Sequence, residues 1–182
     1  MKKILITVMT VFLLSIAGIS SVVTADRIPE ENDDPVDYEQ ILLLANRALK
    51  AVKDEQANRA IRIIEGIIDS LNAKLKILQE EMIILHEEMV ILQEKLMTLL
   101  GLLDNCDPDD HEQIEYLQTQ IQELKLEIQN LQMKICDLDM EMNLVMMLIM
   151  EFDMAKNALF IPDFNDAEMH LKKAIEICLT LI

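Results

Sequence analysis

The densest group of possible ligand side chains runs from Asp104 to Glu112 and includes four aspartates, one glutamate, an asparagine and a histidine. Their oxygens suit a hard cation such as calcium. The spacing matches no EF-hand loop, however, and the glycine that makes the sharp turn of that loop is missing. Helix capping explains the residues more simply, because Asp104 and Asn105 can end one helix while Asp107 caps the next. We therefore prefer capping to metal binding at this site.

A second group is rich in methionine. Its members are Met140, Met142, Met146, Met147, Met150 and Met154, with Met169, His170 and Cys178 on the segment that follows. Thioether clusters outside the cytoplasm can bind Cu(I), so soft-metal binding is one hypothesis for this chain. Methionine is also a common filler of cores and of adaptable interfaces, and a cysteine at an apolar helix position is usually a small buried side chain. We prefer the packing interpretation and assign no metal ligands.

Motifs for catalysis and for cofactor binding are missing from the sequence. Beyond residue 25 only Gly66 and Gly101 remain, and each stands alone, so there is no glycine-rich loop for phosphates or dinucleotides. A di-iron bundle needs glutamate three residues before histidine on facing helices, and none of the three histidines has one. We therefore expect no enzymatic activity, no catalytic residues and no cofactor.

The elements that carry these residues are long helices. Apolar residues step by three and four without interruption at Ala57, Ile61, Ile64, Ile68, Leu71, Leu75, Leu78, Met82, Leu85, Met89, Leu92, Leu96, Leu99 and Leu103. This average spacing of about 3.5 residues keeps one line of side chains, here called the seam, against a partner helix. The composition agrees, because tryptophan is absent, glycine is scarce, and strong helix formers are abundant.

A second helix has an equally regular seam. Its residues are Ile114, Leu117, Ile121, Leu124, Ile128, Leu131, Ile135, Leu138, Met142, Val145, Ile149 and Phe152. The few residues between the two seams force the second helix to fold back antiparallel to the first. We predict an all-α fold, built on a long antiparallel coiled-coil helical hairpin with a short helix at each end forming a small four-helix base. The predicted helices cover about 35–53, 56–104, 108–160 and 164–181.

A pattern of small residues occurs at both ends of the hairpin. Ala45, Ala48, Leu49 and Ala57 are followed 110 residues later by Ala155, Ala158, Leu159 and Ala167. We interpret the two copies as helix–turn–helix corners that make close contacts at alanine and pack together as the base. The first corner requires a turn at residues 53–56, which contain no apolar side chain and neither glycine nor proline.

The N-terminal region differs in composition from the rest. Residues 1–25 combine two lysines, an apolar run and a Val-Thr-Ala ending, which predicts a secretory signal peptide, with an uncleaved membrane anchor as the alternative. Residues 26–34 are acidic and contain proline, as expected of a flexible linker, and residues 35–182 form the helical domain. We therefore expect an exported protein, which is secreted, periplasmic or at the cell surface.

The net charge is strongly negative. The whole chain carries a formal charge of −17, and without the two lysines of residues 1–25 it carries 33 acidic and 14 basic side chains, or −19. This charge repels nucleic acid and anionic lipid headgroups. We therefore predict no nucleic-acid partner, and membrane contact only through an uncleaved N-terminal anchor.

Both long helices have more apolar residues than a seam requires. The surplus residues that we predict to form an interaction surface are Ile77, Ile84, Ile91 and Val90 on the first helix and Leu126, Met133, Met140 and Met147 on the second. A free two-helix hairpin needs one seam per helix, so further stripes imply burial against something else. Our hypothesis is self-assembly or protein–protein interaction, with a homo-oligomer or a helical protein as partner. The alternatives are binding of an apolar ligand or a membrane surface, and soft-metal binding.

Overall fold

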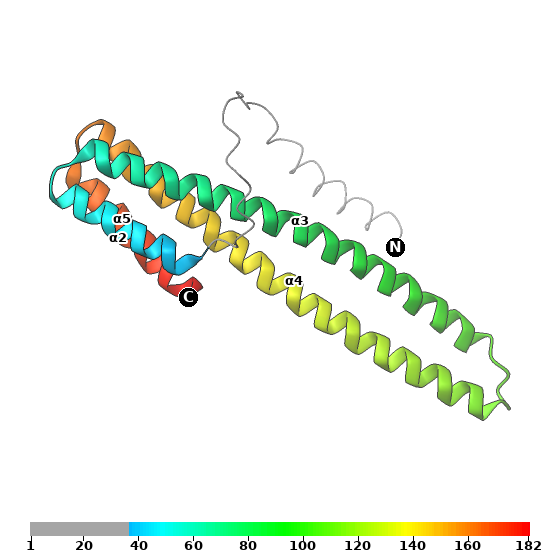
Figure 1. Cartoon of the computed structure of the whole chain (residues 1–182). Coiled ribbons are helices and arrows are strands. Elements are labelled where there is room, and N and C mark those ends of the chain that lie inside the picture. The colour runs from blue at the N-terminus through cyan, green and yellow to red at the C-terminus, as the bar shows by residue number, and fades with distance from the viewer. Residues whose placement is uncertain (1–36) are drawn as a thin grey trace, which may run out of the picture. The chain divides into compact units, whose positions relative to one another are not determined.

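The computed structural model describes residues 37–182, which form four helices (Figure 1). The helices are α2 (Tyr38–Lys53), α3 (Ala57–Asp104), α4 (His111–Phe160) and α5 (Phe164–Leu181). The predicted signal peptide (1–25), the linker (26–34) and the first residues of the helix predicted from residue 35 lie outside the described residues.

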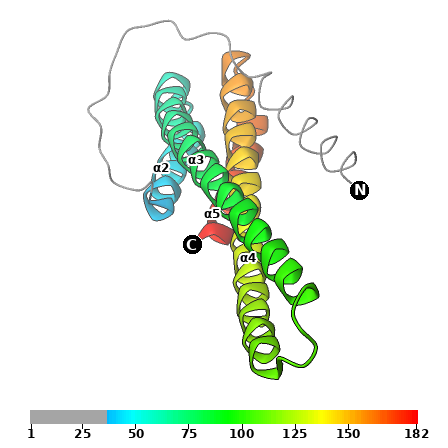
Figure 2. The same ribbon diagram turned by 90° about the vertical axis from the view of Figure 1, so that its right-hand side faces the viewer.

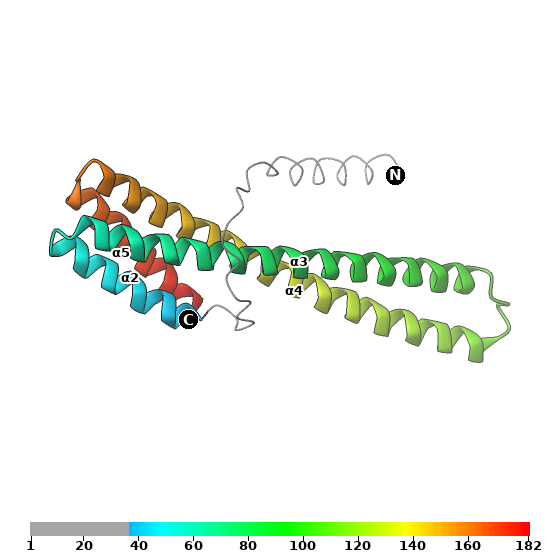
Figure 3. The same ribbon diagram turned by 45° about the horizontal axis from the view of Figure 1, so that its top comes forward.

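The two long helices, α3 and α4, pack antiparallel, which confirms the predicted all-α hairpin. The short helix α2 packs against α3 and α5, and α5 also packs against α4. Figures 2 and 3 show both short helices beside the same half of the hairpin, away from the bend. The predicted base of four helices is therefore present.

Three helices begin with an aspartate cap, and the cap of α4 differs from the prediction. Asp37 caps α2 by accepting the N–H of Glu39 at 2.9 Å. α4 begins at His111 and not near residue 108, because its cap is Asp110, whose Oδ1 accepts the N–H of Gln113 at 3.1 Å. Asp107 lies earlier in the loop. The reversal of the chain takes six residues between the two helices, so the last aspartate of the loop becomes the cap.

The seam residues form two hydrophobic clusters, which divide the hairpin. The first cluster joins all four helices, and on the hairpin its buried residues end at Leu78 and Leu138. The second cluster joins α3 and α4 alone, around Met89, Leu92 and Leu131. We call residues 38–78 and 138–181 the base, and residues 79–137 the stalk.

In the base the hairpin buries a second set of residues besides the seam. These residues are Ala60 and Ile67 on α3 and Leu148 and Ala155 on α4, all of them fully buried. The described helices that contact α3 are α4 and α2, and those that contact α4 are α3 and α5, so α2 and α5 cover this second set. The sequence pattern predicted one seam per helix, which holds only for the stalk.

The corners of the base correspond to each other at an offset of 107 residues, so the predicted offset of 110 is wrong by about one helical turn. The N–H of Gln56 donates to the carbonyl of Ala51 at 2.8 Å, and the N–H of Asp163 donates to the carbonyl of Ala158 at 2.9 Å. Alanine recurs every third residue near the first corner, so either offset aligns alanine with alanine. Only the hydrogen bonds of the turns determine the register.

The first corner closes through a residue in the left-handed region. Glu55 has a φ of 54°, and its N–H donates to the carbonyl of Val52 at 3.0 Å. Together with the bond from Gln56 to Ala51, this is the Schellman arrangement that ends many helices. Glycine usually occupies this position because it has no Cβ, which explains why the sequence carried no clear turn signal.

Candidate interaction surface

All eight residues predicted to form the interaction surface are exposed in the described part of the chain. Their exposed fractions range from 48% for Val90 to 63% for Ile84. Neighbouring seam residues such as Leu92 and Leu131 are buried. The structure therefore separates the apolar residues of each long helix into a buried seam and an exposed stripe.

The α3 stripe consists of Ile77, Ile84 and Ile91, and acidic residues border it on both sides. The residues three and four positions after each isoleucine are Glu80 and Glu81, Glu87 and Glu88, and Glu94 and Lys95. Residues at these spacings are neighbours on a helix surface. The stripe is therefore framed by five carboxylates and one ammonium group.

The α4 stripe consists of Leu126, Met133, Met140 and Met147, and its surroundings are mostly uncharged. The residues three and four positions after its members are Gln129, Asn130, Cys136, Asp137, Asn143, Leu144, Met150 and Glu151. The last of these carboxylates already pairs with His170. The two stripes therefore have similar exposure but different electrostatic surroundings.

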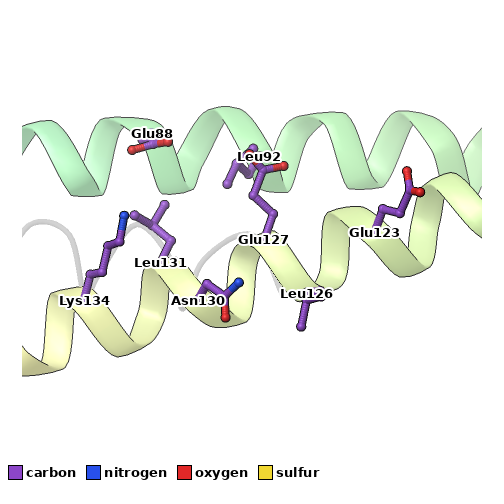
Figure 4. A pocket seen from close by; sticks show the side chains of 8 residues that line it. All are labelled: Glu88, Leu92, Glu123, Leu126, Glu127, Asn130, Leu131 and Lys134. Atoms are coloured by element: carbon purple, nitrogen blue, oxygen red, sulfur yellow. The ribbon is translucent and has the colours of Figure 1, made fainter.

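A groove runs between α3 and α4 in the stalk (Figure 4). Its two adjoining parts are lined by Glu88, Ile91, Leu92, Glu94, Lys95, Thr98 and Leu99 of α3 and by Gln120, Glu123, Leu124, Leu126, Glu127, Asn130, Leu131 and Lys134 of α4. The buried seam leucines lie at its bottom and carboxylates at its sides. We call this feature the stalk groove; Ile91 of the α3 stripe and Leu126 of the α4 stripe belong to its lining.

The carboxylates of the stalk groove are not neutralised within the described residues. None of the ion pairs that residues 37–182 form includes Glu88, Glu123 or Glu127, and none joins α3 to α4 in the stalk. Residues 79–137 carry 14 acidic and three basic side chains, a net charge of −11. The stalk therefore presents apolar side chains in a strongly negative field.

Polar contacts join three helices where the base meets the stalk. Tyr38 of α2 donates its hydroxyl proton to Oε1 of Glu141 on α4 at 2.7 Å, and Nζ of Lys74 on α3 lies 3.1 Å from the same oxygen. The ammonium group also lies 5.8 Å from the centre of the Tyr38 ring. Burial, and then the hydrogen bond to Glu141, raise the pKa of Tyr38 well above its ordinary value. Sequence reasoning missed this cluster because its members are up to 103 residues apart.

The possible soft-metal ligands have different environments. Nδ1 of the buried His170 donates to Oε2 of Glu151 at 2.6 Å, which links α5 to α4. Cys178 is fully buried, and burial raises its pKa to about 11. By contrast, Met146, Met150 and Met154 are exposed. Histidine and cysteine therefore serve the packing of the base in this structure, and the exposed methionines are available for contact.

The acidic bend between α3 and α4 is built from local hydrogen bonds. Oδ1 of Asp107 accepts the N–H of Asp109 at 3.1 Å, and Asp110 caps α4. Within residues 37–182 no group of three or more histidine, cysteine, aspartate or glutamate side chains is arranged to hold a metal ion. The capping interpretation accounts for these two aspartates.

No known protein family, curated protein or solved structure matches the chain. Of the helices that the structure describes, none combines the length and the apolar character needed to cross a bilayer. The two stripes and the stalk groove are therefore the features of residues 37–182 that indicate a function.

Proposed function

We propose that this chain is an exported, non-catalytic assembly protein that contacts other helical chains through the α3 stripe and the α4 stripe. The observation that supports the proposal is the exposure of apolar side chains at seven-residue spacing along both arms of a hairpin that already has a buried seam. Contiguous exposed apolar surface is characteristic of interaction sites. The expected export rests on the signal-like sequence of residues 1–25.

The α4 stripe is the surface that suits a second copy of the chain. Two identical patches meet across the two-fold axis of a symmetric dimer, so a patch with few charges avoids repulsion between like groups. Met133, Met140 and Met147 supply such a patch, and methionine adapts its shape to the surface that it meets. We therefore expect self-association through α4.

Light scattering after size-exclusion chromatography tests this proposal. The monomer has a mass of 20.9 kDa, and we expect a larger mass for the unaltered chain. Met133→Glu with Met140→Glu places two carboxylates on the α4 stripe, so the mass should fall toward that of the monomer while the helical circular dichroism signal remains.

The matched control is Gln118→Glu with Gln132→Glu, which adds the same charge to exposed positions of the same helix that are not three or four residues from any member of the α4 stripe. This variant should keep the mass of the unaltered chain. Equal masses for all three proteins would contradict self-association through the α4 stripe.

A further inference from the structure

The stalk groove continues the surface that α2 and α5 cover in the base. Between residues 60 and 95 of α3 and between residues 120 and 155 of α4, the residues spaced seven apart on one side of the seam occupy what we call flank positions. These positions are Ala60, Ile67, Lys74, Glu81, Glu88 and Lys95 along α3, and Ala155, Leu148, Glu141, Lys134, Glu127 and Gln120 along α4. The first two of each series are buried in the base. Five of the last six line the stalk groove.

The covering layer of α2 and α5 ends where the flank positions become polar. Tyr38, the first residue of α2, contacts the flank residues Lys74 and Glu141. Beyond this point no described helix lies over the flank positions of the hairpin (Figure 3). One continuous side of the hairpin therefore carries helices in the base and is uncovered in the stalk.

The uncovered part of α3 is long enough for another helix. Residues 79–104 of α3 make up the stalk arm, which is about 39 Å long at 1.5 Å per residue. A helix of three heptads is about 32 Å long and fits within this length. Such a helix would contact the seam leucines at the bottom of the groove and Ile84 and Ile91 beside it, in continuation of the layer that α2 and α5 form.

The charges of the groove determine which helix it suits. Its sides carry Glu88, Glu94, Glu123 and Glu127 against Lys95 and Lys134, and the described structure pairs none of these carboxylates with a base. A second copy laid along the groove would bring its own stalk, with a net charge of −11, against the groove carboxylates and be repelled there, whereas the α4 stripe has few charges beside it. A helix with lysine or arginine along both edges of an apolar face would neutralise the carboxylates while it buries the isoleucines.

We propose that the stalk groove binds an amphipathic helix with basic edges, supplied by a partner protein. This inference rests on the proposed assembly function and assigns a partner chemistry to the groove between α3 and α4, whose lining includes Leu126 but none of the three methionines of the α4 stripe. A groove of this kind recognises apolar side chains at helical spacing on the helix that it binds, and the charges along the edges determine which partner helix binds.

Synthetic peptides test the inference with the full chain. The first peptide has three heptads with isoleucine and leucine on one face and lysine along both edges. The second replaces every lysine by glutamate, and the third keeps the composition of the first in an order without helical periodicity. We expect fluorescence anisotropy to show binding of the first peptide, at least about tenfold tighter than the third, no binding of the second, and an affinity that falls as salt rises.

Two pairs of variants locate the binding. Ile84→Ala with Ile91→Ala should weaken binding of the first peptide by about tenfold or more. Ile83→Ala with Met97→Ala, at similarly exposed positions of α3 that neither line the groove nor belong to the predicted surface, should change the affinity less than about twofold. Glu88→Gln with Glu127→Gln should weaken binding and reduce its salt dependence. Glu112→Gln with Glu115→Gln removes the same charge outside the groove and should have a smaller effect.

The inference is overturned if the first and third peptides bind equally, or if the groove variants behave like their controls. It is also overturned if Ile84→Ala with Ile91→Ala lowers the mass of the chain alone in light scattering, because a second copy would then occupy the groove. None of these outcomes affects the self-association test on Met133 and Met140, so failure of the inference is distinguishable from failure of the proposed function.

Discussion

In the base, α3 and α4 are packed against two further helices, whereas in the stalk they pack only against each other. The seam continues through both regions with the same spacing. What changes is the flank position, which is Ile67 or Leu148 in the base and Glu88 or Glu127 in the stalk. The hairpin therefore has apolar flank residues where helices of its own chain cover it and polar flank residues along the uncovered groove.

The base and the stalk also differ in how their carboxylates are paired. In the base, Glu141 and Glu151 each bond to side chains of neighbouring helices. In the stalk, Glu88 and Glu127 line a groove without a paired base in the described structure. Glu141 and Glu151 therefore link helices of the base, whereas Glu88 and Glu127 link no helices in the described structure.

Exchanging residue types at the flank positions gives the largest expected effect. Ile67→Glu places a carboxylate at a fully buried position, so the free energy of unfolding should fall by about 4 kcal/mol or more. Glu88→Ile makes the opposite change at an exposed position and should alter it by less than about 0.5 kcal/mol. Urea denaturation followed by circular dichroism measures both. Similar losses for the two variants would show that the base and the stalk do not differ as described.

The cysteines should report the same difference through their reactivity. Cys178 is buried in the base and its pKa is raised to about 11, whereas Cys136 is exposed on the stalk. At pH 8, iodoacetamide should therefore modify Cys136 at least about a hundredfold faster, because the thiolate is the reacting form. Mass spectrometry of the alkylated protein gives the rates. In denaturant the two rates should become equal, and equal rates in the native protein would contradict the burial of Cys178.

The direction of the pH effect follows from these raised pKa values. A thiol or phenol whose pKa is higher in the folded state contributes stability that is complete below its unfolded pKa and is lost as the pH rises toward the folded value. For Cys178 this loss begins above about pH 8.5 and for Tyr38 above about pH 10. The base should therefore become less stable in alkali.

Tyr38→Phe tests the contact at the border of the two regions. Loss of the hydrogen bond to Glu141 should lower the free energy of unfolding by about 1 kcal/mol, while the ring beneath Lys74 is kept. The control is Tyr116→Phe on the stalk, where the tyrosine is exposed, and its stability should not change. Thermal unfolding at pH 7 measures both. A loss at Tyr116 equal to that at Tyr38 would contradict the proposed role of this contact.

The smallest expected effect is a gain at the first corner of the base. Glu55→Gly removes a Cβ from a left-handed residue, so the free energy of unfolding should rise by about 0.5 to 1 kcal/mol. Asp54→Gly, at a neighbouring residue with a negative φ of −86°, should give no such gain. Urea denaturation of both variants makes the test, and a loss of stability in Glu55→Gly would exclude the Schellman role of this residue.

The sequence by itself determined the helices, their seams, the reversal of the chain and the stripes that remain exposed. Each of these depends on periodic spacing or on a local signal. The residues of both seams are buried or half-buried, and all eight predicted surface positions are exposed. The predicted cap of α4, Asp107, was wrong, because Asp107, Asp109 and Asp110 can all cap a helix and only the path of the loop selects Asp110.

Only the tertiary structure decided the register of the corners, the cluster of Tyr38, Lys74 and Glu141, and the continuity between the covered side of the base and the stalk groove. These features depend on residues that lie far apart along the chain, and no local spacing reports such distances. The groove in particular exists because α2 and α5 are shorter than the helices that they cover. The sequence pattern predicts the length of each helix. The side of the hairpin on which α2 and α5 pack is decided by tertiary contacts.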